Sequence, residues 1–307
     1  MRHRVVEIVA FISYWTGIDS LFYWLNRKAK RIITFHNVLP DELYVNNLAN
    51  GVSTSESGFR LIIGEIEKRY CFSTDVWDAK TCTITFDDGY VNQAEIAGRV
   101  LGEMGIPAIL FVAGDLIGST EPLLIDKLLH NTQTVQEWVS QVWPNMKHGK
   151  YNSTVQLQLN TSTFSDEYKR LRLTGVTEEM LEGLRAKGWK IGWHTWRHLP
   201  LVSLSEDEVR KELDCPAAYR GEVLSYPFGN PDEVGETAIR LAEELGYPCA
   251  VSNTYAAGAK HGRYFLPRMG LPSNKYMLHF VLSGAKFWMM YRRLLPKMRW
   301  QDGAEIG

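Results

Sequence analysis

Two short motifs carry side chains whose types and spacing suit metal-assisted hydrolysis. In the T-F-D-D-G motif, Asp87 and Asp88 follow a strand-like apolar run. Adjacent carboxylates at a strand end cannot both enter an apolar core, so at least one must bind a cation, form an ion pair or transfer a proton. In the H-T-W-R-H motif, His194 and His198 would lie on one side of a helical turn and could share a metal ion. One carboxylate and two histidines make a common open metal site, which leaves the second carboxylate free to act as a base.

A third motif makes the pattern specific. The S-Y-P-F-G stretch at residues 225–229 lies downstream of the other two motifs. In order and spacing, the three motifs resemble those of the polysaccharide deacetylases of carbohydrate esterase family 4, whose catalytic unit is the NodB homology domain and whose third motif reads R-P-P-Y-G or similar. The resemblance extends from about Arg31 to about Leu271. It implies a distorted (β/α) barrel of fewer than eight strands, and a hydrolase that cleaves acetyl groups from sugars, mostly from acetamides.

The resemblance assigns metal binding to Asp88, His194 and His198, and the role of catalytic base to Asp87. A divalent metal lowers the pKa of a water molecule that it binds to about 7, so a nearby carboxylate can take the proton as the water attacks an amide carbonyl. The backbone N–H of Phe228 is the implied oxyanion donor. The candidate substrate-binding residues are Tyr226, Pro227, Phe228 and His36. The family implies zinc, although this donor set suits several divalent metals.

The chain departs from the family pattern at two roles. Many members have an arginine that orients the base at the position of Ser225, and we hypothesise that Arg268, at a predicted strand end, supplies that charge instead. The family also has a late histidine that protonates the leaving amine, and no residue matches it clearly. His279 and His261 are candidates, but each is more typical of a surface or helix position. His36 ends the first predicted strand in an F-H-N-V setting found in a subset of the family, and we expect it to point toward the rim.

The composition is that of an ordinary globular protein. The chain has 307 residues, of which 45% are hydrophobic and 22% charged. Its formal net charge of -1 offers no electrostatic case for nucleic-acid binding. The four cysteines form no C-x-x-C pair, so neither a disulfide nor a zinc–thiolate site is expected, and a reduced cytoplasmic setting fits.

Apolar runs alternate with amphipathic helical segments, which predicts an α/β fold with parallel strands. Strands are expected at residues 32–35, 81–86, 108–112, 189–193, 223–226, 249–252 and 265–268. Every candidate functional residue lies at or directly after the end of one of these runs, and in a parallel barrel those positions share one rim. Residues 116–175 are less regular, and we expect an insertion that forms one wall of the cleft.

The two ends of the chain are expected to be helical appendages of one catalytic domain. We divide the chain into an amphipathic helical segment at 1–30, the barrel at 31–272 and a basic amphipathic helix at 273–307. Glu7 and Asp19 interrupt the apolar N-terminal stretch, so neither a signal peptide nor a membrane span is expected there. Residues 275–300 hold basic residues interleaved with aromatics and no acid, a pattern typical of an interfacial anchor for anionic lipid. At both ends, packing on the barrel and contact with a membrane surface are the two interpretations.

The sequence therefore predicts a metal-dependent deacetylase acting on an amino sugar of a bacterial surface glycan or of a lipid-linked precursor. We expect a cytoplasmic protein, peripheral to the inner face of the membrane if its ends bind lipid. Three alternatives stay open at this point. The same site could remove O-acetyl groups as an esterase or formyl groups as an amino-sugar deformylase, or the fold could bind carbohydrate without catalysis.

Overall fold

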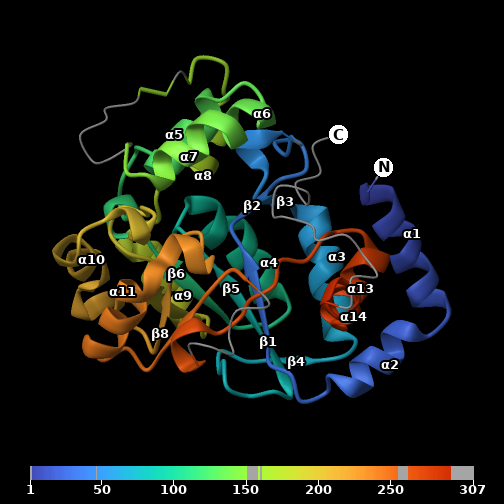
Figure 1. Ribbon diagram of the computed structural model, residues 1–307. Coiled ribbons are helices and arrows are strands. Elements are labelled where there is room, and N and C mark those ends of the chain that lie inside the picture. Colours follow the sequence, from blue (N-terminus) through green and yellow to red (C-terminus); the bar gives the residue numbers. More distant parts are fainter. Residues whose placement is uncertain (1, 46, 151–157, 160, 255–261, 292–307) are drawn as a thin grey trace.

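A curled parallel sheet forms the centre of the molecule (Figure 1). The computed structural model describes residues 2–45, 47–150, 158–159, 161–254 and 262–291. The strands of the sheet are β1 (Arg31–Phe35), β4 (Cys71–Phe72), β5 (Thr81–Phe86), β6 (Ala108–Val112), β7 (Lys190–Trp193), β8 (Val223–Ser225) and β9 (Cys249–Val251). Their order is β1-β5-β6-β7-β8-β9, with β4 paired to the start of β5, and every pairing is parallel.

The segment after β9 closes the gap between the last strand and the first. The Leu266 N–H donates to the Ala250 carbonyl of β9 at 2.8 Å, and the Met269 N–H donates to the Ile32 carbonyl of β1 at 3.0 Å. The predicted strand at 265–268 is therefore only a pair of isolated bridges, because the chain crosses from one edge to the other within four residues. This crossing carries Arg268 into the barrel, and the predicted distorted (β/α) barrel is confirmed.

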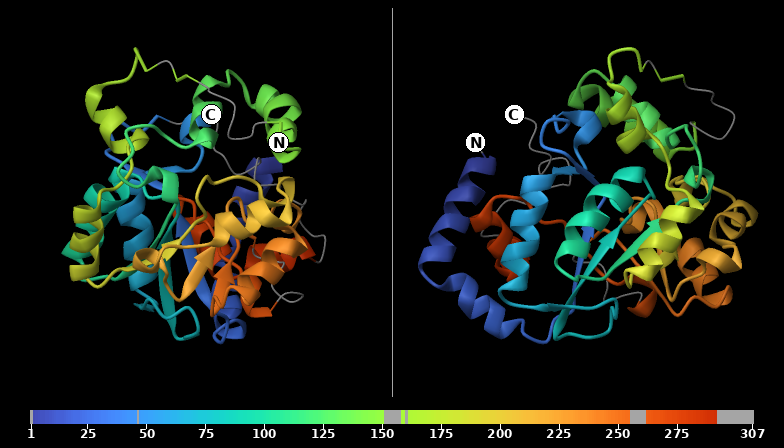
Figure 2. Two further views of the ribbon diagram at one scale, coloured as in Figure 1. Left: turned by 90° about the vertical axis from the view of Figure 1, so that its left-hand side faces the viewer. Right: turned by 180° about the vertical axis from the view of Figure 1, so that it is seen from behind.

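Helices cover the outside of the sheet (Figures 1 and 2). They are α3 (Glu56–Glu67), the π-helical turn η2 (Gln93–Ala97) continued by α4 (Gly98–Glu103), α9 (Glu178–Ala186), α10 (Glu206–Leu213) and α11 (Pro231–Glu244). Side-chain caps fix several starts. The Thr177 hydroxyl accepts from the Met180 N–H at 3.3 Å, and Ser205 forms a capping box with Glu208. Helix α3 begins at Glu56, because the Ser55 hydroxyl accepts from the Gly58 N–H at 3.2 Å.

Short elements complete the rim and the connections. They are β2 (Asn37–Leu39) and β3 (Ser53–Ser55), which pair in parallel, and the 3₁₀ turns η1 (Leu48–Asn50), η3 (Gly114–Leu116), η5 (Leu201–Ser203), η6 (Ala217–Tyr219) and η7 (Gly262–Phe265). The segment 40–58 between β2 and α3 thus contains η1, β3 and the start of α3.

The insertion packs above the rim at the carboxyl ends of the strands (Figure 1, top). It contains α5 (Leu124–Asn131), α6 (Val135–Glu137), the π-helical turn η4 (Trp138–Val142), α7 (Trp143–Lys147) and α8 (Asp166–Leu173). A buried ion pair joins α8 to α5, with Arg172 Nη2 2.5 Å from Asp126 Oδ1. The Tyr90 hydroxyl also donates to Asp126, so this pair fixes the insertion to the loop that follows β5.

The two ends of the described chain pack against each other. Helices α1 (Arg2–Trp15) and α2 (Ile18–Leu25) contact α13 (Lys275–Leu282) and α14 (Ala285–Tyr291). Phe280 is fully buried beneath α1 and α2, so packing on the protein, one of the two interpretations for this end, describes α13. The basic residues beyond Tyr291 lie outside the described residues. Within the described ranges no single helix is long and apolar enough to cross a membrane, and only α1 and α2 taken together, bent by 80°, pass that test.

Candidate functional site

Asp88, His194 and His198 converge at the rim of the barrel. Asp88 follows β5 and His194 directly follows β7. Asp88 Oδ1 lies 3.7 Å from His194 Nε2 and 3.4 Å from His198 Nε2, and all three side chains are buried. Residues 194–198 form no helical turn, because Thr195 and His198 have positive φ angles of 67° and 54°. The two imidazoles meet through this irregular loop, not through helical spacing.

The donor atoms of this cluster fit a divalent metal. Among the described residues, Asp88 Oδ1 and His194 Nε2 are buried and have no hydrogen-bond partner. Buried polar atoms are rarely left unpaired, so these two point to a ligand. His194 Nδ1 lies 2.8 Å from the Ser225 carbonyl. Since a carbonyl can only accept, Nδ1 carries the proton and the Nε2 lone pair faces Asp88, which is the arrangement of a metal-binding imidazole.

Burial sets the protonation of the three ligands. It raises the pKa of Asp88 to about 7 and lowers the pKa of His194 to about 3. Burial also lowers the pKa of His198. Both imidazoles are therefore neutral near neutral pH, which is the form that binds a metal ion.

Asp87 forms a buried two-point ion pair with Arg268. Arg268 Nη1 donates to Asp87 Oδ1 at 2.7 Å, and Nη2 donates to Oδ2 at 2.5 Å. The Ser225 hydroxyl donates to Oδ1 at 3.2 Å. A carboxylate has about four acceptor positions, so one remains, on Oδ2. Burial alone would raise the pKa of Asp87, but Arg268 and the neighbouring imidazoles hold it well below its ordinary value, and the group stays ionised.

The free side of Asp87 faces two imidazoles. His36 Nε2 and His194 Nε2 each lie 3.9 Å from Asp87 Oδ2. His194 is fully buried, whereas the His36 side chain retains 20% exposure. His36 thus lies at the opening of the site, as expected from its place at the end of β1.

The third motif contributes one partly exposed residue, Phe228. Its ring lies 4.8 Å from the His198 ring and 4.9 Å from the ring of Trp143 in the insertion. The Phe228 N–H forms no hydrogen bond with the described part of the chain, which leaves it available to a ligand. Pro227 is buried, and Tyr226 packs into the core against Phe265. The structure therefore does not bring Tyr226 to the opening, where a sugar would contact it.

Backbone strain marks the same place. The non-glycine residues with positive φ in the described chain are Asp88 (86°), Thr195 (67°), His198 (54°) and Phe228 (60°). Such conformations cost roughly 1–3 kcal/mol each and cluster at functional sites. All of these residues belong to the three sequence motifs, so the strain identifies the site independently of the residue types.

Three supporting residues escaped the sequence analysis. Gln93 accepts from the Gly89 and Tyr90 N–H groups at 3.0 Å each and donates to the carbonyl of Asp87, which fixes the D-D-G loop. Glu212 of α10 accepts from the N–H groups of residues 196 and 197 at 2.9 Å each and so fixes the histidine loop. The third is Asn253, which accepts from Arg268 at 2.7 Å. The position of Ser225 within the third motif was a usable signal for its contact with Asp87, whereas Gln93, Glu212 and Asn253 carried none.

The two candidates for the late histidine are not part of this cluster. His279 lies in α13, with Nδ1 2.9 Å from the Tyr23 hydroxyl and Nε2 3.1 Å from Glu65. It therefore joins terminal helices to α3, away from the rim. His261 lies outside the described residues.

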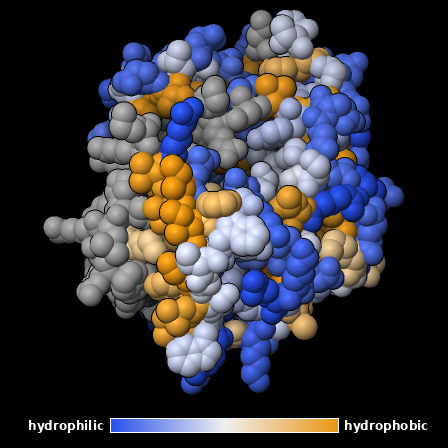
Figure 3. Space-filling view, turned by 90° about the vertical axis from the view of Figure 1, so that its right-hand side faces the viewer, coloured by the Kyte–Doolittle hydropathy of each residue, from blue (hydrophilic) through white to orange (hydrophobic). Residues whose placement is uncertain are grey.

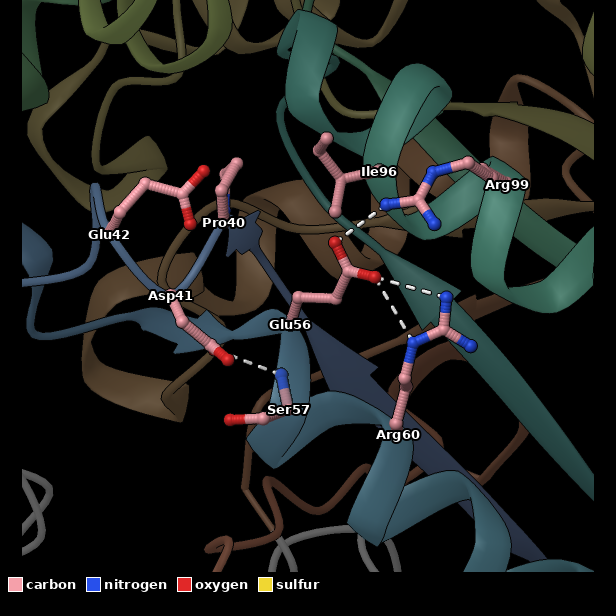
Figure 4. Close-up of a pocket in the computed structure, with 8 residues that line it drawn as sticks. All are labelled: Pro40, Asp41, Glu42, Glu56, Ser57, Arg60, Ile96 and Arg99. Atoms are coloured by element: carbon pink, nitrogen blue, oxygen red, sulfur yellow. Dashed lines mark hydrogen bonds and ion pairs between the residues drawn. The ribbon is translucent and has the colours of Figure 1, made fainter.

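A second hollow lies between α3 and α4 (Figure 4). Three of its charged side chains pair with one another, since Glu56 lies 3.0 Å from Arg60 Nη2 and 2.6 Å from Arg99 Nη2. Asp41 caps the N–H of Ser57 at 3.0 Å. None of the buried unpaired side-chain atoms found in the described ranges belongs to a residue that lines this hollow, in contrast to the rim.

Comparison with known proteins agrees with this geometry. The family model described as polysaccharide deacetylase matches residues 76–250, more than half of the chain. The Bacillus subtilis protein named "Putative polysaccharide deacetylase YxkH" is 24% identical over 198 residues, covering 62% of this chain and 51% of that protein, so the chain spans about half of the length of this relative.

Solved structures share the fold. The deacetylase PplD of Streptococcus pyogenes, in complex with acetate, superposes with a TM-score of 0.53 at 16% identity, covering 83% of this chain and 97% of that one. IcaB from Ammonifex degensii superposes with a TM-score of 0.52 at 13% identity, covering 83% and 98%. At these identities the likeness concerns the fold.

Proposed function

Since this chain belongs to the polysaccharide deacetylase family, we propose that it hydrolyses the N-acetyl group of an amino sugar. The observation that carries the proposal is the meeting of unpaired Asp88 Oδ1 and His194 Nε2 beside Asp87, whose one remaining acceptor position faces the same space. Metal-assisted hydrolysis needs these parts together: an open metal site and an adjacent base.

Asp88, His194 and His198 would hold a divalent metal, zinc in our proposal, which when bound supplies Lewis-acid polarisation and activates water. Asp87 Oδ2 takes the proton of the attacking water, because Arg268 keeps the carboxylate ionised and fixes its orientation. The Phe228 N–H donates a hydrogen bond to the oxyanion. The water oxygen bonds to the acyl carbon, the C–N bond breaks, and the products are acetate and a free amine.

We assign protonation of the leaving amine to His36. Amide cleavage needs a proton donor, because an unprotonated amine is a poor leaving group. Among the described residues near Asp87, Arg268 and His194 are fully buried and engaged, whereas His36 is partly exposed with its Nε2 3.9 Å from Oδ2. A ring nitrogen of His36 can donate a proton to the amine at the opening of the site.

The substrate in our proposal is an N-acetyl hexosamine of a bacterial surface glycan or of its lipid-linked precursor. The family mostly cleaves acetamides, and the insertion forms an aromatic wall over the site with Trp143 beside Phe228. Aromatic rings of this kind pack on the apolar faces of sugars and leave the hydroxyl groups to polar partners. We further propose that the protein acts at the cytoplasmic side of the membrane, where such precursors are assembled.

Acetate release tests the proposal. Purified protein is assayed on N-acetyl hexosamine oligomers and on lipid-linked amino sugars, with added zinc and with chelator. We expect zinc-dependent release by the wild type, loss of at least about a hundredfold in Asp87→Asn, and little change in Asp166→Asn, whose carboxylate is exposed on α8. Release that persists with chelator or in Asp87→Asn would overturn the mechanism. Cleavage of O-acetyl or formyl substrates alone would overturn the substrate assignment.

A further inference from the structure

The outer face of α1 and α2 exposes large apolar side chains. Figure 3 faces this side of the molecule and shows hydrophobic side chains gathered in a band. The exposed apolar residues of these helices are Val5, Ile8, Phe11, Ile12, Trp15, Leu21, Trp24 and Leu25. Trp15 is 68% exposed and Trp24 is 60% exposed. In the rest of the described chain the exposed large apolar residues are Val45, Leu61, Trp77 and Val202, which are scattered. A gathered patch of this kind marks an interaction surface, whereas single exposed apolar residues need no explanation.

The exposed charges on these two helices and on the turn that follows them have one sign. Between Arg4 and Lys28 every exposed residue is apolar, uncharged or basic. Neither of the two acids of the segment is among its exposed residues. Glu7 is half-buried, and Asp19 is 4% exposed and accepts from the Ser13 hydroxyl at 2.7 Å. The exposed face is therefore complementary to an apolar surface with anionic groups at its edge.

The helices are held parallel to the protein surface. Their inner sides pack on α13 through Val6 and Phe22, and the Asn26 side chain donates to the Ser283 carbonyl at 2.8 Å. The 14 residues of α1 span roughly 21 Å, less than the ~30 Å of a bilayer core, and α2 turns away at 80°. One face of each helix is thus committed to protein, and the geometry is that of helices lying in an interface.

A buried polar network makes this arrangement rigid. His279 of α13 binds the hydroxyl of Tyr23 in α2 and the carboxylate of Glu65 in α3. Asp19 of α2 accepts a hydrogen bond from the hydroxyl of Ser13 in α1 at 2.7 Å and so joins the two helices. Because the network ties both helices to the barrel, a surface that docks on them fixes the orientation of the whole enzyme.

We propose that the outer face of α1 and α2 is a docking surface for an anionic lipid bilayer, with Trp15 and Trp24 entering the interface and Arg4, Arg27 and Lys28 contacting lipid headgroups. The composition of residues 275–300 pointed to the C-terminal segment as a lipid anchor, but the apolar side chains of α13, its first helix, are buried against α1 and α2. Docking needs no substrate, so this inference stands apart from the proposed deacetylation.

Vesicle flotation of the full chain tests the proposal. Vesicles of phosphatidylcholine alone are compared with vesicles that contain phosphatidylglycerol. We expect binding to the anionic vesicles, weakened at least about tenfold in the double variant Trp15→Ser/Trp24→Ser. The double variant Arg4→Gln/Lys28→Gln is expected to lose about fivefold per charge, and only on the anionic vesicles.

Val202→Ser is the control, because Val202 is 46% exposed in η5, which contacts α11, and is outside the band. It should bind like the wild type. All four proteins should melt at similar temperatures, since the replaced side chains are exposed. Absence of binding to anionic vesicles would overturn the proposal. A dimer in solution that the tryptophan double variant abolishes would also overturn it, because the band would then be an interface between two copies.

Discussion

Replacing Arg268 by methionine separates its charge from its volume. The methionine side chain is of similar length and apolar, so the cavity is largely refilled while Asp87 loses both of its guanidinium hydrogen bonds. The remaining partner of Asp87 in the described chain is the Ser225 hydroxyl. The variant therefore leaves a carboxylate in the barrel with no cation from the protein, because both side chains are fully buried.

The expected cost is about 4 kcal/mol of unfolding free energy. Charges whose centres are roughly 4 Å apart attract by about 4 kcal/mol at an effective dielectric constant near 20. Removal of one partner from a buried pair costs about 3–5 kcal/mol by experience with other proteins. Typical domains have an unfolding free energy of about 5–15 kcal/mol. Urea denaturation of the protein, after its metal has been removed with a chelator, can therefore measure a loss of this size. The double variant Asp87→Asn/Arg268→Met has no charged side chain at either of these two buried positions. It should therefore be more stable than Arg268→Met alone.

The loss of stability in Arg268→Met should grow as the pH rises. In the wild type the pKa of Asp87 is depressed, so its pairing stabilises the fold above the unfolded-state pKa of about 3.9 and the effect is lost as the pH falls through the folded-state value. In Arg268→Met burial dominates and raises the pKa above the unfolded value, so protonation on acidification relieves the buried charge. The difference in stability between wild type and variant is therefore largest near about pH 7 and narrows toward about pH 4.

Activity gives the second measurement. In Arg268→Met, burial raises the pKa of the base Asp87 because the guanidinium no longer offsets it. The acid limb of kcat/KM should therefore move to higher pH, and activity near neutrality should fall. Arg268→Lys is the matched control, since it keeps the charge and loses the two-point geometry, and it should show a smaller shift. A folded Arg268→Met protein with an unshifted acid limb and wild-type kcat/KM would refute the reasoning.

Three further predictions concern the other parts of the site. His36→Gln should lower kcat on an acetamide about 10²–10⁴-fold but should hardly affect an ester with a good leaving group, and equal losses on both substrates would contradict its role as proton donor. Phe228→Gly keeps the backbone N–H and tolerates the positive φ of 60°, so kcat should persist while KM rises several-fold. A large loss of kcat would contradict the assignment of substrate binding to the ring and of oxyanion binding to the N–H. Zinc affinity, measured by calorimetry, should fall about tenfold per pH unit below about 7, because Asp88 with its pKa raised to about 7 must lose a proton, while His194 with a pKa of about 3 is already neutral. An affinity that is constant between about pH 5 and about pH 7 would contradict this.

The parts of the fold that sequence could predict are those that local patterns determine. The runs at 81–86 and 108–112 coincide with β5 and β6, because β-branched residues favour strands in the first and a continuous apolar run is typical of a buried parallel strand in the second. The common rim then follows from topology, and it brings Asp88 and His194 together although they follow different strands. The helical turn considered for residues 194–198 is wrong, since that loop is held by Glu212 from a later helix, which no local pattern could reveal.

The contact between Arg268 and Asp87 depends on the path of a segment that forms only isolated β-bridges. Residues 266–269 pair with β9 at one end and with β1 at the other, and only this crossing aims the guanidinium at the carboxylate. The residue type suggested a charge near the base, but the partner that makes the pairing specific, Asn253, lies on a loop without any pattern. Such contacts are set by closure of the barrel, which is a property of the whole chain.

The two ends of the chain show why composition alone could not say which surface meets lipid. Both α1 and α13 are amphipathic and bear aromatics and basic residues, so both suit an interface by sequence. An amphipathic helix must bury one face, but its sequence does not say whether protein or lipid covers that face. Here Phe280 of α13 is fully buried against the N-terminal helices, whereas Trp15 and Trp24 remain outside. The apolar face of α13 thus supports the helices whose outer apolar side chains are exposed, and only the packed structure distinguishes these two roles.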